Sequence, residues 1–558
     1  MKIKKLLFVM FVLSIVSMAN AATYTWTASV AGDSNWSNTS NWTASYPTSG
    51  DTAQINYLSA GQPVINSAVE SGNVRIGCTA ATGVASLTIN SGGTLSTPTN
   101  IASSRSINVG YVSGAEGLLT LNDGGTINSK AINVGVSAVG TFDMLGGTVN
   151  VTTTAACATQ IQIGCLSGHG VAKFNMYGGT INMIYNSAET ADKVLSVGYY
   201  GSTSAAEALS QFNMSGGTIN MNDGLSTSQG QVIAVAYGAG TDNSEFNLSG
   251  GTINLKTSTT GGEELFAVGY GTSSSGVLNM TGGTINIDGT STAAAFSVGY
   301  ASGSTGIANI SGGTLNTRFI TLGRIGSGTI NLSDDGAINL TSGMRIGESA
   351  SRTGNGILNM TGGSIENGYI AIGYATASAL TTPDQFNISG GTVDVDKILV
   401  GRAGNGNLTI TGSDAEISTN YLFVGCDGET SYSTGTITFN VGANGVTAIQ
   451  ADSVMLGVDN VSSIANLIVT LTAAPLTGDI LLIDNQGTAA VSGLFDSVNS
   501  GSAAEGAAVM LSFGGIDYTY TLTYVGGTGN DVVLTIPEPA TLIILGFGLI
   551  GVLRTRKH

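Results

Sequence analysis

The chain has 558 residues with a formal net charge of −17; 82 residues are glycine, 9% are charged and 6% are aromatic. The hydrophobic content of 42% excludes a disordered chain, and glycines without a three-residue period, together with scarce proline, exclude collagen. Abundant Gly, Thr, Asn and Ser disfavour a helical bundle, so we expect an extended all-β protein.

The first 21 residues have the composition of a secretory signal peptide. Three lysines within the first five residues form a positive start, an apolar run follows over residues 6–16, and Ala19 and Ala21 supply the small residues of a cleavage site. The apolar run is shorter than the ~20 residues that a membrane span needs. We therefore expect residues 1–21 to direct export and to be removed.

Residues 22–70 are expected to cap the N-terminal end of the fold. All three tryptophans of the chain, Trp26, Trp36 and Trp42, lie in this segment. Their indole rings can form the core of a cap, and the alternative is an exposed platform that stacks on carbohydrate.

A Gly-Gly-Thr motif recurs through residues 71–457. Its copies begin at residues 92, 124, 146, 178, 216, 250, 282, 312 and 390, with a Gly-Gly-Ser variant at 362 and degenerate copies at 335 and 412. Between the copies an apolar residue precedes a glycine, as in Val109-Gly110. The shortest step between copies is 22 residues, and the extra length of longer steps falls after the Gly-Gly-Thr segment.

These features predict a β-solenoid. Apolar and polar residues alternate around each copy, which indicates short strands with one apolar face, and paired glycines supply turns with positive φ. We expect a right-handed parallel β-helix of about 14 coils, roughly 65 Å long at ~4.8 Å per coil, with β caps at both ends. A β-propeller is the alternative, but its blades need ~40–50 residues.

After residue 457 the repeat stops, and residues 458–536 are predicted to form a C-terminal β cap. Strands are expected at 467–471, 480–483, 518–524 and 531–536. The tryptophan-containing start and the ending from Tyr524 to Leu534 resemble autotransporter passenger proteins with Gly-rich repeats.

Residues 537–558 contain three elements in a fixed order. They are the tripeptide Pro537, Glu538 and Pro539, the apolar residues 540–553, and a basic end with Arg554, Arg556 and Lys557. This order resembles the PEP-CTERM sorting signal of Gram-negative bacteria. The resemblance implies recognition by an exosortase, a short transmembrane segment held transiently in the inner membrane with its basic end in the cytoplasm, and removal of the tail on export to the envelope, cell surface or extracellular matrix.

The charge of the exported part restricts its partners. Because the two ends hold six basic residues and one glutamate, residues 22–536 carry 12 Lys and Arg against 34 Asp and Glu, a net charge of −22. Nucleic acid is therefore excluded as a partner, whereas extracellular polysaccharide, other surface proteins and divalent cations fit better.

The position two residues after the Thr of each copy holds asparagine in eight coils and carboxylates in the next three. The asparagines are Asn128, Asn150, Asn182, Asn220, Asn254, Asn286, Asn316 and Asn339, and the carboxylates are Glu366, Asp394 and Glu416. Carboxylates stacked ~4.8 Å apart repel one another, and a hard cation would relieve that repulsion. The functional interpretation is a weak Ca²⁺ site, and the alternatives are a solvated acidic stripe or a glycosidase pair. No other cofactor is expected.

A second position, directly after the apolar-Gly pair, holds tyrosine or cysteine in many coils. The tyrosines are Tyr111, Tyr199, Tyr270, Tyr300 and Tyr374, and the cysteines are Cys78, Cys165 and Cys426. We expect an internal stack of side chains, with a sugar-stacking surface as the alternative. The three cysteines are too far apart to pair with one another, which leaves Cys157 as a partner for Cys165.

These observations favour an exported structural or interaction protein, adhesin-like, that makes multivalent weak contacts along a rigid rod. We do not expect an enzyme. The alternative is a polysaccharide lyase or glycosidase on the same fold, which needs Asp clustered with Arg or Lys. A lesser alternative is ice binding by the regular Thr-x-Asn array.

Overall fold

The computed structural model describes most of the chain between residues 22 and 536. The described ranges are 22–80, 82–97, 106–152, 159–165, 170–184, 193–199, 209–222, 230–240, 244–256, 264–289, 295–351, 353–375, 382–428, 433–457, 463–474 and 478–536. The expected signal peptide and the expected sorting tail lie outside these ranges, as does Cys157. No helix within the described ranges is long and apolar enough to cross a membrane.

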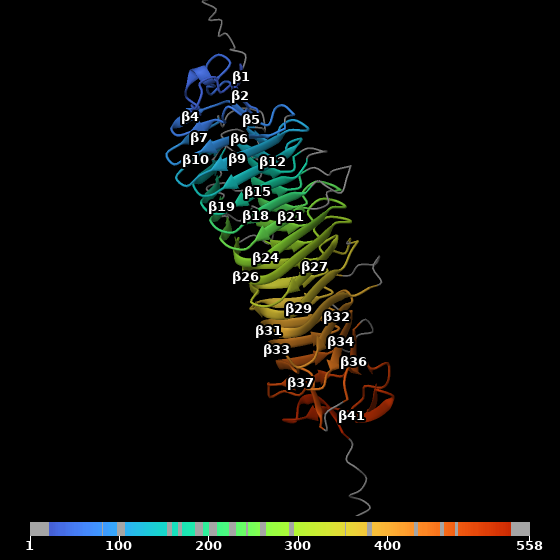
Figure 1. The fold of residues 1–558 in the computed structure, drawn as a ribbon. Coiled ribbons are helices and arrows are strands. Elements are labelled where there is room, and N and C mark those ends of the chain that lie inside the picture. The colour runs from blue at the N-terminus through green and yellow to red at the C-terminus, as the bar shows by residue number, and fades with distance from the viewer. Residues whose placement is uncertain are drawn as a thin grey trace, which may run out of the picture.

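Parallel strands in three columns make up most of the fold, because each strand pairs with the strand three positions further along the chain. For example, β10 (Thr126–Ser129) pairs with β13 (Thr148–Val151), and β13 pairs with β16 (Thr180–Ile184), always in parallel. Figure 1 shows the resulting coils stacked into an elongated body between the N-terminal and C-terminal ends. The all-β class is confirmed, and the pairing is consistent with the expected β-solenoid rather than with antiparallel propeller blades.

The strands of each column share a position within the coil. The first column contains β2 (Thr52–Ile55), β5 (Asn73–Ile76), β8 (Ile107–Val109), β11 (Ala131–Val134), β14 (Thr159–Ile163), β17 (Lys193–Val197), β20 (Gln231–Val235), β23 (Glu264–Val268), β25 (Ala295–Val298) and β30 (Tyr369–Ile372). The second contains β3 (Val64–Ile65), β6 (Val84–Ile89), β9 (Glu116–Leu121), β12 (Val139–Met144), β15 (Ala172–Met176), β18 (Ser210–Met214), β21 (Ser244–Leu248), β27 (Ser327–Leu332), β32 (Gly406–Thr411), β34 (Thr434–Val441), β36 (Ile464–Leu471) and β39 (Ser497–Val498). The third contains β4 (Ala68–Glu70), β7 (Thr94–Ser96), β10, β13, β16, β19 (Thr218–Asn222) and β22 (Thr252–Lys256).

Further along the chain, several strands are long enough to run from one column into the next. They are β24 (Ser275–Asp288), β26 (Thr305–Leu322), β28 (Ala337–Ile346), β29 (Gly356–Glu366), β31 (Asp384–Val400), β33 (Ala415–Val424) and β35 (Ile449–Leu456).

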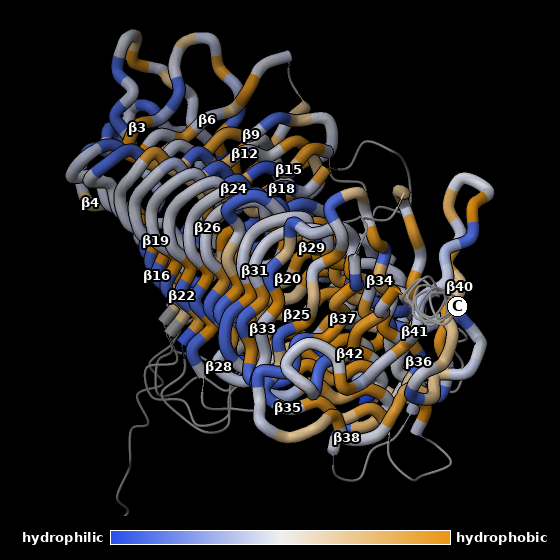
Figure 2. The backbone as a smooth tube through the Cα atoms, turned by 90° about the horizontal axis from the view of Figure 1, so that it is seen from below, coloured by the Kyte–Doolittle hydropathy of each residue, from blue (hydrophilic) through white to orange (hydrophobic). Residues whose placement is uncertain are grey.

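The core lies inside the coils and follows from the alternation of the sequence. Along β18, Phe212 and Met214 are buried, whereas Gln211 and Asn213 are partly exposed. In-register pairing places like side chains on top of one another, so the ring of Phe212 stacks 4.8 Å from those of Phe174 and Phe246. Hydrophobic and hydrophilic residues therefore run in separate bands across the coils (Figure 2).

The second glycine of the Gly-Gly-Thr motif is required by both conformation and space. Gly251 has φ +89°, and a Cβ atom on it would lie 2.7 Å from the carbonyl oxygen of Gly217 in the preceding coil. Positive φ and such close approach of backbones are both unfavourable for any residue with a side chain.

The N-terminal end is closed by the three tryptophans, which lie near β1 (Thr23–Thr25) and the short 3₁₀ helix η1 (Thr39–Asn41). Trp26, Trp36 and Trp42 are at most 4% exposed, and the ring of Trp42 lies edge-on to the other two at 5.3 and 4.7 Å. The three tryptophans are therefore buried against one another, as the prediction of a cap core requires.

The C-terminal end is closed by antiparallel strands. They are β37 (Ile480–Asn485), β40 (Ala508–Phe513), β41 (Ile516–Gly526) and β42 (Asp531–Thr535), and β42 pairs with both β37 and β41. Parallel stacking itself begins with the pair β1–β2 and continues to β38 (Ser492–Gly493) and β39. It thus reaches beyond the expected boundaries at residues 70 and 457.

Candidate functional site

A ladder of asparagine side chains runs along the third column. We call it the groove ladder, and its members are Asn128, Asn150, Asn182, Asn220, Asn254, Asn286, Asn316 and Asn339. The Nδ2 of each member donates to the Oδ1 of the member before it, over 2.7–3.1 Å. At the start of the ladder, Asn128 donates to the hydroxyl of Ser96 over 3.3 Å. The column of asparagines predicted from the sequence is thereby confirmed.

The groove ladder leaves part of each amide available. A side-chain amide has two N–H donors and an oxygen with two lone pairs, and the ladder uses one donor and one lone pair per residue. The asparagines are half-buried, so the remaining donor and lone pair are accessible from one side.

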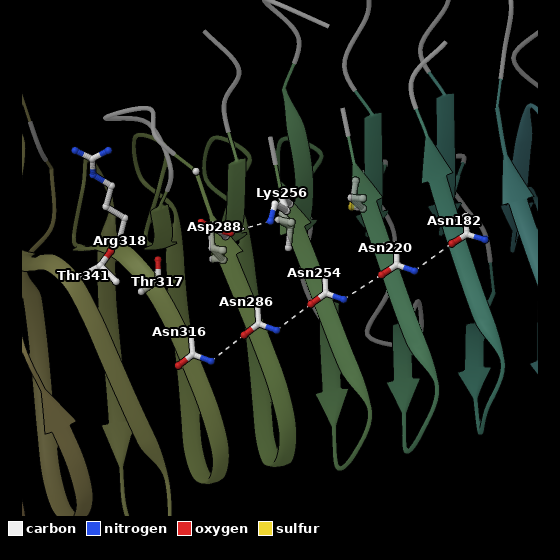
Figure 3. A pocket seen from close by; sticks show the side chains of 14 residues that line it. Asn182, Asn220, Asn254, Lys256, Asn286, Asp288, Asn316, Thr317, Arg318 and Thr341 are labelled. Carbon is white, nitrogen blue, oxygen red and sulfur yellow. Dashed lines mark hydrogen bonds and ion pairs between the residues drawn. The ribbon is translucent and has the colours of Figure 1, made fainter. Parts of the chain in front are cut away.

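A groove of about 740 Å³ lies over the middle of this ladder (Figure 3). It is lined by Asn182, Asn220, Met221, Asn254, Leu255, Lys256, Asn286, Ile287, Asp288, Gly289, Asn316, Thr317, Arg318 and Thr341. The volume is within the ~300–1,000 Å³ range of small-molecule sites. Most of its lining residues lie on β19, β22, β24 and β26, in the parts of these strands that belong to the third column.

Charged side chains stand at one side of the groove. Lys256 Nζ lies 3.4 Å from Asp288 Oδ2, and the two side chains are 62% and 73% exposed. They come from neighbouring coils, because Lys256 is opposite Asp288 in the pairing of β22 with β24. Such an exposed ion pair contributes little to stability, and its local net charge is zero.

A second amide ladder, which sequence reasoning missed, lies on the second column away from the groove. It begins with the carboxylate of Asp143 and continues through Asn175, Asn213, Asn247, Asn279, Asn309, Asn331, Asn359 and Asn387. Its hydrogen bonds measure 2.8–3.0 Å. The signal was present as an asparagine three residues before the first glycine of most Gly-Gly-Thr or Gly-Gly-Ser motifs.

The three predicted carboxylates do not form one column. Glu366 is opposite Asn339 and Asp394 is opposite Glu366, as expected. However, Glu416 is opposite Thr392, and Ser418 takes the place beside Asp394 and donates to its Oδ1 over 2.9 Å. The placement of Glu416 is wrong by two residues, because the degenerate copy at 412–414 does not provide the turn that aligns with Gly390-Gly391.

The predicted Ca²⁺ site loses its third ligand with this shift. Across the described ranges there is no group of three His, Cys, Asp or Glu side chains that could hold a metal ion. Glu366 and Asp394 remain neighbours, and both are exposed.

The tyrosine column forms a continuous stack. Tyr199, Tyr237, Tyr270 and Tyr300 follow one another at 4.9–5.1 Å, with ring planes within 13° of parallel. Tyr237 was missed because Ala236 replaces the glycine before it. Both faces of Tyr237 and Tyr270 are covered by neighbouring rings, so they offer no free face to a sugar. We expected an internal stack, but the rings are only half-buried.

Further along the same column, the position after the glycine holds Arg324, Glu348, Tyr374 and Arg402 in turn. The guanidinium of Arg324 lies 4.4 Å from the ring centroid of Tyr300, and its Nε is 3.4 Å from Glu348. Arg345 Nη1 lies 2.8 Å from the same carboxylate, and its guanidinium is 4.1 Å from the ring of Phe319. These cations are held by a carboxylate and by aromatic rings, an arrangement that stabilises the fold.

The cysteines of this column are shielded from solvent to different degrees. Burial raises the pKa of the Cys78 thiol to about 11 and also raises the pKa of Cys426. The predicted partner of Cys165, Cys157, lies outside the described ranges.

Comparison with known proteins identifies the C-terminal end. Residues 535–557 match the PEP-CTERM protein-sorting motif. The chain matches no curated protein and no solved structure. The motif implies a protein that an exosortase recognises and that is exported to the cell envelope or the extracellular space. The resemblance of the repeats to autotransporter passengers stays a prediction.

Proposed function

We propose that this chain is a non-catalytic interaction protein of the cell surface or extracellular matrix, with an adhesin-like role. The observation that supports this most is the groove ladder, in which one chemical group repeats from coil to coil inside a groove. A repeated contact of this kind is suited to holding a polymer or a surface through many weak interactions.

The composition of the groove also favours binding over hydrolysis. Glycosidases act with two carboxylates, ~5–5.5 Å apart in retaining enzymes and ~6.5–9.5 Å apart in inverting ones. Among the described residues that line the groove, Asp288 is the only carboxylate, and it is paired with Lys256. The alternative of a lyase or glycosidase therefore depends on Glu366 and Asp394, which lie outside the groove.

The remaining expectations form part of the same proposal. We infer a right-handed β-helix of about 14 coils that needs no cofactor. An ice-binding surface is less favoured, because the Thr-x-Asn array lies beside a groove and its amides are hydrogen-bonded to one another.

The proposal is tested by the location and binding of the exported protein. Alanine at Pro537, Glu538 and Pro539 should prevent normal sorting and change the fraction in which the protein is found. The purified exported protein should co-sediment with extracellular polymer from its own cells and release no reducing or unsaturated sugars. Sugar release that Glu366→Gln or Asp394→Asn abolishes would establish the enzyme instead, and failure to bind any extracellular material would refute the interaction role.

A further inference from the structure

We propose that the groove binds a linear, neutral, hydroxyl-rich polysaccharide that lies parallel to the long axis of the rod. This inference rests on the proposed function and names the class of ligand that the groove takes.

The hydrogen-bonding capacity of the groove ladder selects hydroxyl groups. Each amide has one N–H donor and one lone pair left after its ladder bonds. A hydroxyl group can accept a hydrogen bond from the free N–H and donate one to the free lone pair, so it satisfies both groups. A carboxylate only accepts and an ammonium only donates, so either would leave half of the available groups unpaired.

The regular spacing of the amides that line the groove favours a polymeric ligand. Five consecutive members of the groove ladder, from Asn182 to Asn316, line it, and each step is one coil. At ~4.8 Å per coil these amides extend over roughly 19 Å along the rod. A ligand that uses all of them must be long, linear and repetitive, and the groove volume of about 740 Å³ has room for a short segment of such a chain.

Charge and backbone pairing exclude the other polymers. Three charged residues line the groove: Lys256 and Asp288 neutralise one another, and the guanidinium of Arg318 lies 5.3 Å from the ring centroid of Phe319. The exported part of the chain as a whole has a net charge of −22, which repels nucleic acid and strongly acidic polysaccharides. A peptide could add to a sheet only at a free edge. β22 has no free edge here, because it is paired with β19 on one side and with β24 on the other.

The strand β24 supplies a matched pair of variants. Asn286 belongs to the groove ladder and lines the groove, whereas Asn279 belongs to the second amide ladder and does not. Each donates one ladder bond of 2.9 Å and accepts one of 2.8–2.9 Å. Asn286→Ala and Asn279→Ala should therefore change the melting temperature alike, and only Asn286→Ala should affect the groove.

The experiment is calorimetric titration of the exported protein with linear hexasaccharides of β-linked glucose, xylose and mannose, and with hexagalacturonate as the charged counterpart. We expect at least one neutral hexasaccharide to bind, Asn286→Ala to weaken that binding about tenfold, Asn279→Ala to leave it unchanged, and hexagalacturonate not to bind.

The contrary outcomes separate the two proposals. If no neutral hexasaccharide binds at 10 mM, if only hexagalacturonate binds, or if the two variants affect binding equally, the groove assignment is overturned. When the unmodified protein nevertheless co-sediments with extracellular polymer, the interaction function survives that result. When it binds neither the hexasaccharides nor extracellular material, both proposals fall.

Discussion

The second amide ladder predicts that a residue in its middle stabilises the rod more than a residue at its end. Asn279 donates to Asn247 and accepts from Asn309, both over 2.9 Å. Asn279→Ala removes both bonds and leaves the two neighbouring amides with unused groups. At ~0.5–1.5 kcal/mol net for each bond, the loss should be about 2 kcal/mol.

The end of the ladder gives the comparison. Asn387 donates to Asn359 over 3.0 Å, and the residue opposite it in the next coil is Thr409, which ends the series of amides. Asn387→Ala removes one ladder bond and a longer, weaker bond of 3.4 Å to Oε1 of Gln385, and should therefore cost about 1 kcal/mol. Both sites are half-buried, so water replaces part of each lost bond in either variant.

Hydrogen exchange is the suitable assay, because a repeat array does not unfold as one two-state unit and local opening energies are needed. The opening free energy of amides in β21, β24 and β26 should fall by about 2 kcal/mol in Asn279→Ala. In Asn387→Ala, the opening free energy of amides in β29 and β31 should fall by about half as much. Equal losses in the two variants, or losses below about 0.3 kcal/mol, would show that the ladder is not a source of stability.

Three further predictions concern single residues. Gly251→Ala should lower the opening free energy of neighbouring amides in hydrogen exchange by about 3 kcal/mol, because it combines φ +89° with a Cβ placed 2.7 Å from the backbone carbonyl oxygen of Gly217. Gly240→Ala, at φ +66° with open space around it, should cost about 1 kcal/mol, and equal costs would contradict the close-contact argument. Burial raises the pKa of Tyr524 from 10.0 to about 12, so the folded state holds this proton more tightly, and the contribution of Tyr524 to stability should be constant below pH 10 and be lost as the pH rises to 12. Tyr524→Phe should therefore show a smaller fall in melting temperature between pH 10 and 12 than the unmodified protein, and an equal fall would refute the assignment. Cys78, with its pKa at about 11, should react with iodoacetamide at pH 8 about a hundredfold more slowly in the folded protein than in urea, as read by mass spectrometry of its peptide; equal rates would contradict its shielding.

The repeated part of the fold could be predicted because one coil aligns with the next. Each Asn of the groove ladder was found from its place two residues after a Thr, and parallel pairing then stacked identical residues. The same reasoning failed at Glu416, where the motif is degenerate and the sequence contains no turn signal strong enough to fix the register. A shift of two residues keeps the apolar face inward, so alternation alone cannot detect it.

The two ends of the fold and the groove could be predicted less well from the sequence. Strands of the C-terminal cap were placed correctly, as in β41 and β42, but their antiparallel pairing follows from contacts that no periodicity encodes. The asparagines were known, yet the groove over them depends on Lys256, Asp288 and Arg318, which differ from coil to coil. Tyr237 was missed for a similar reason, because a single Ala replaced the glycine that marked its position.

The position of β42 has a consequence for biogenesis. This strand ends at Thr535, the residue at which the sorting motif starts, and it lies between β37 and β41. Of the strands that the structure describes, the last to leave the translocation machinery is thus the one that closes the C-terminal end of the coil stack. A chain halted partway through secretion keeps unpaired N–H and C=O groups along both flanking strands, and such edges join one molecule to another.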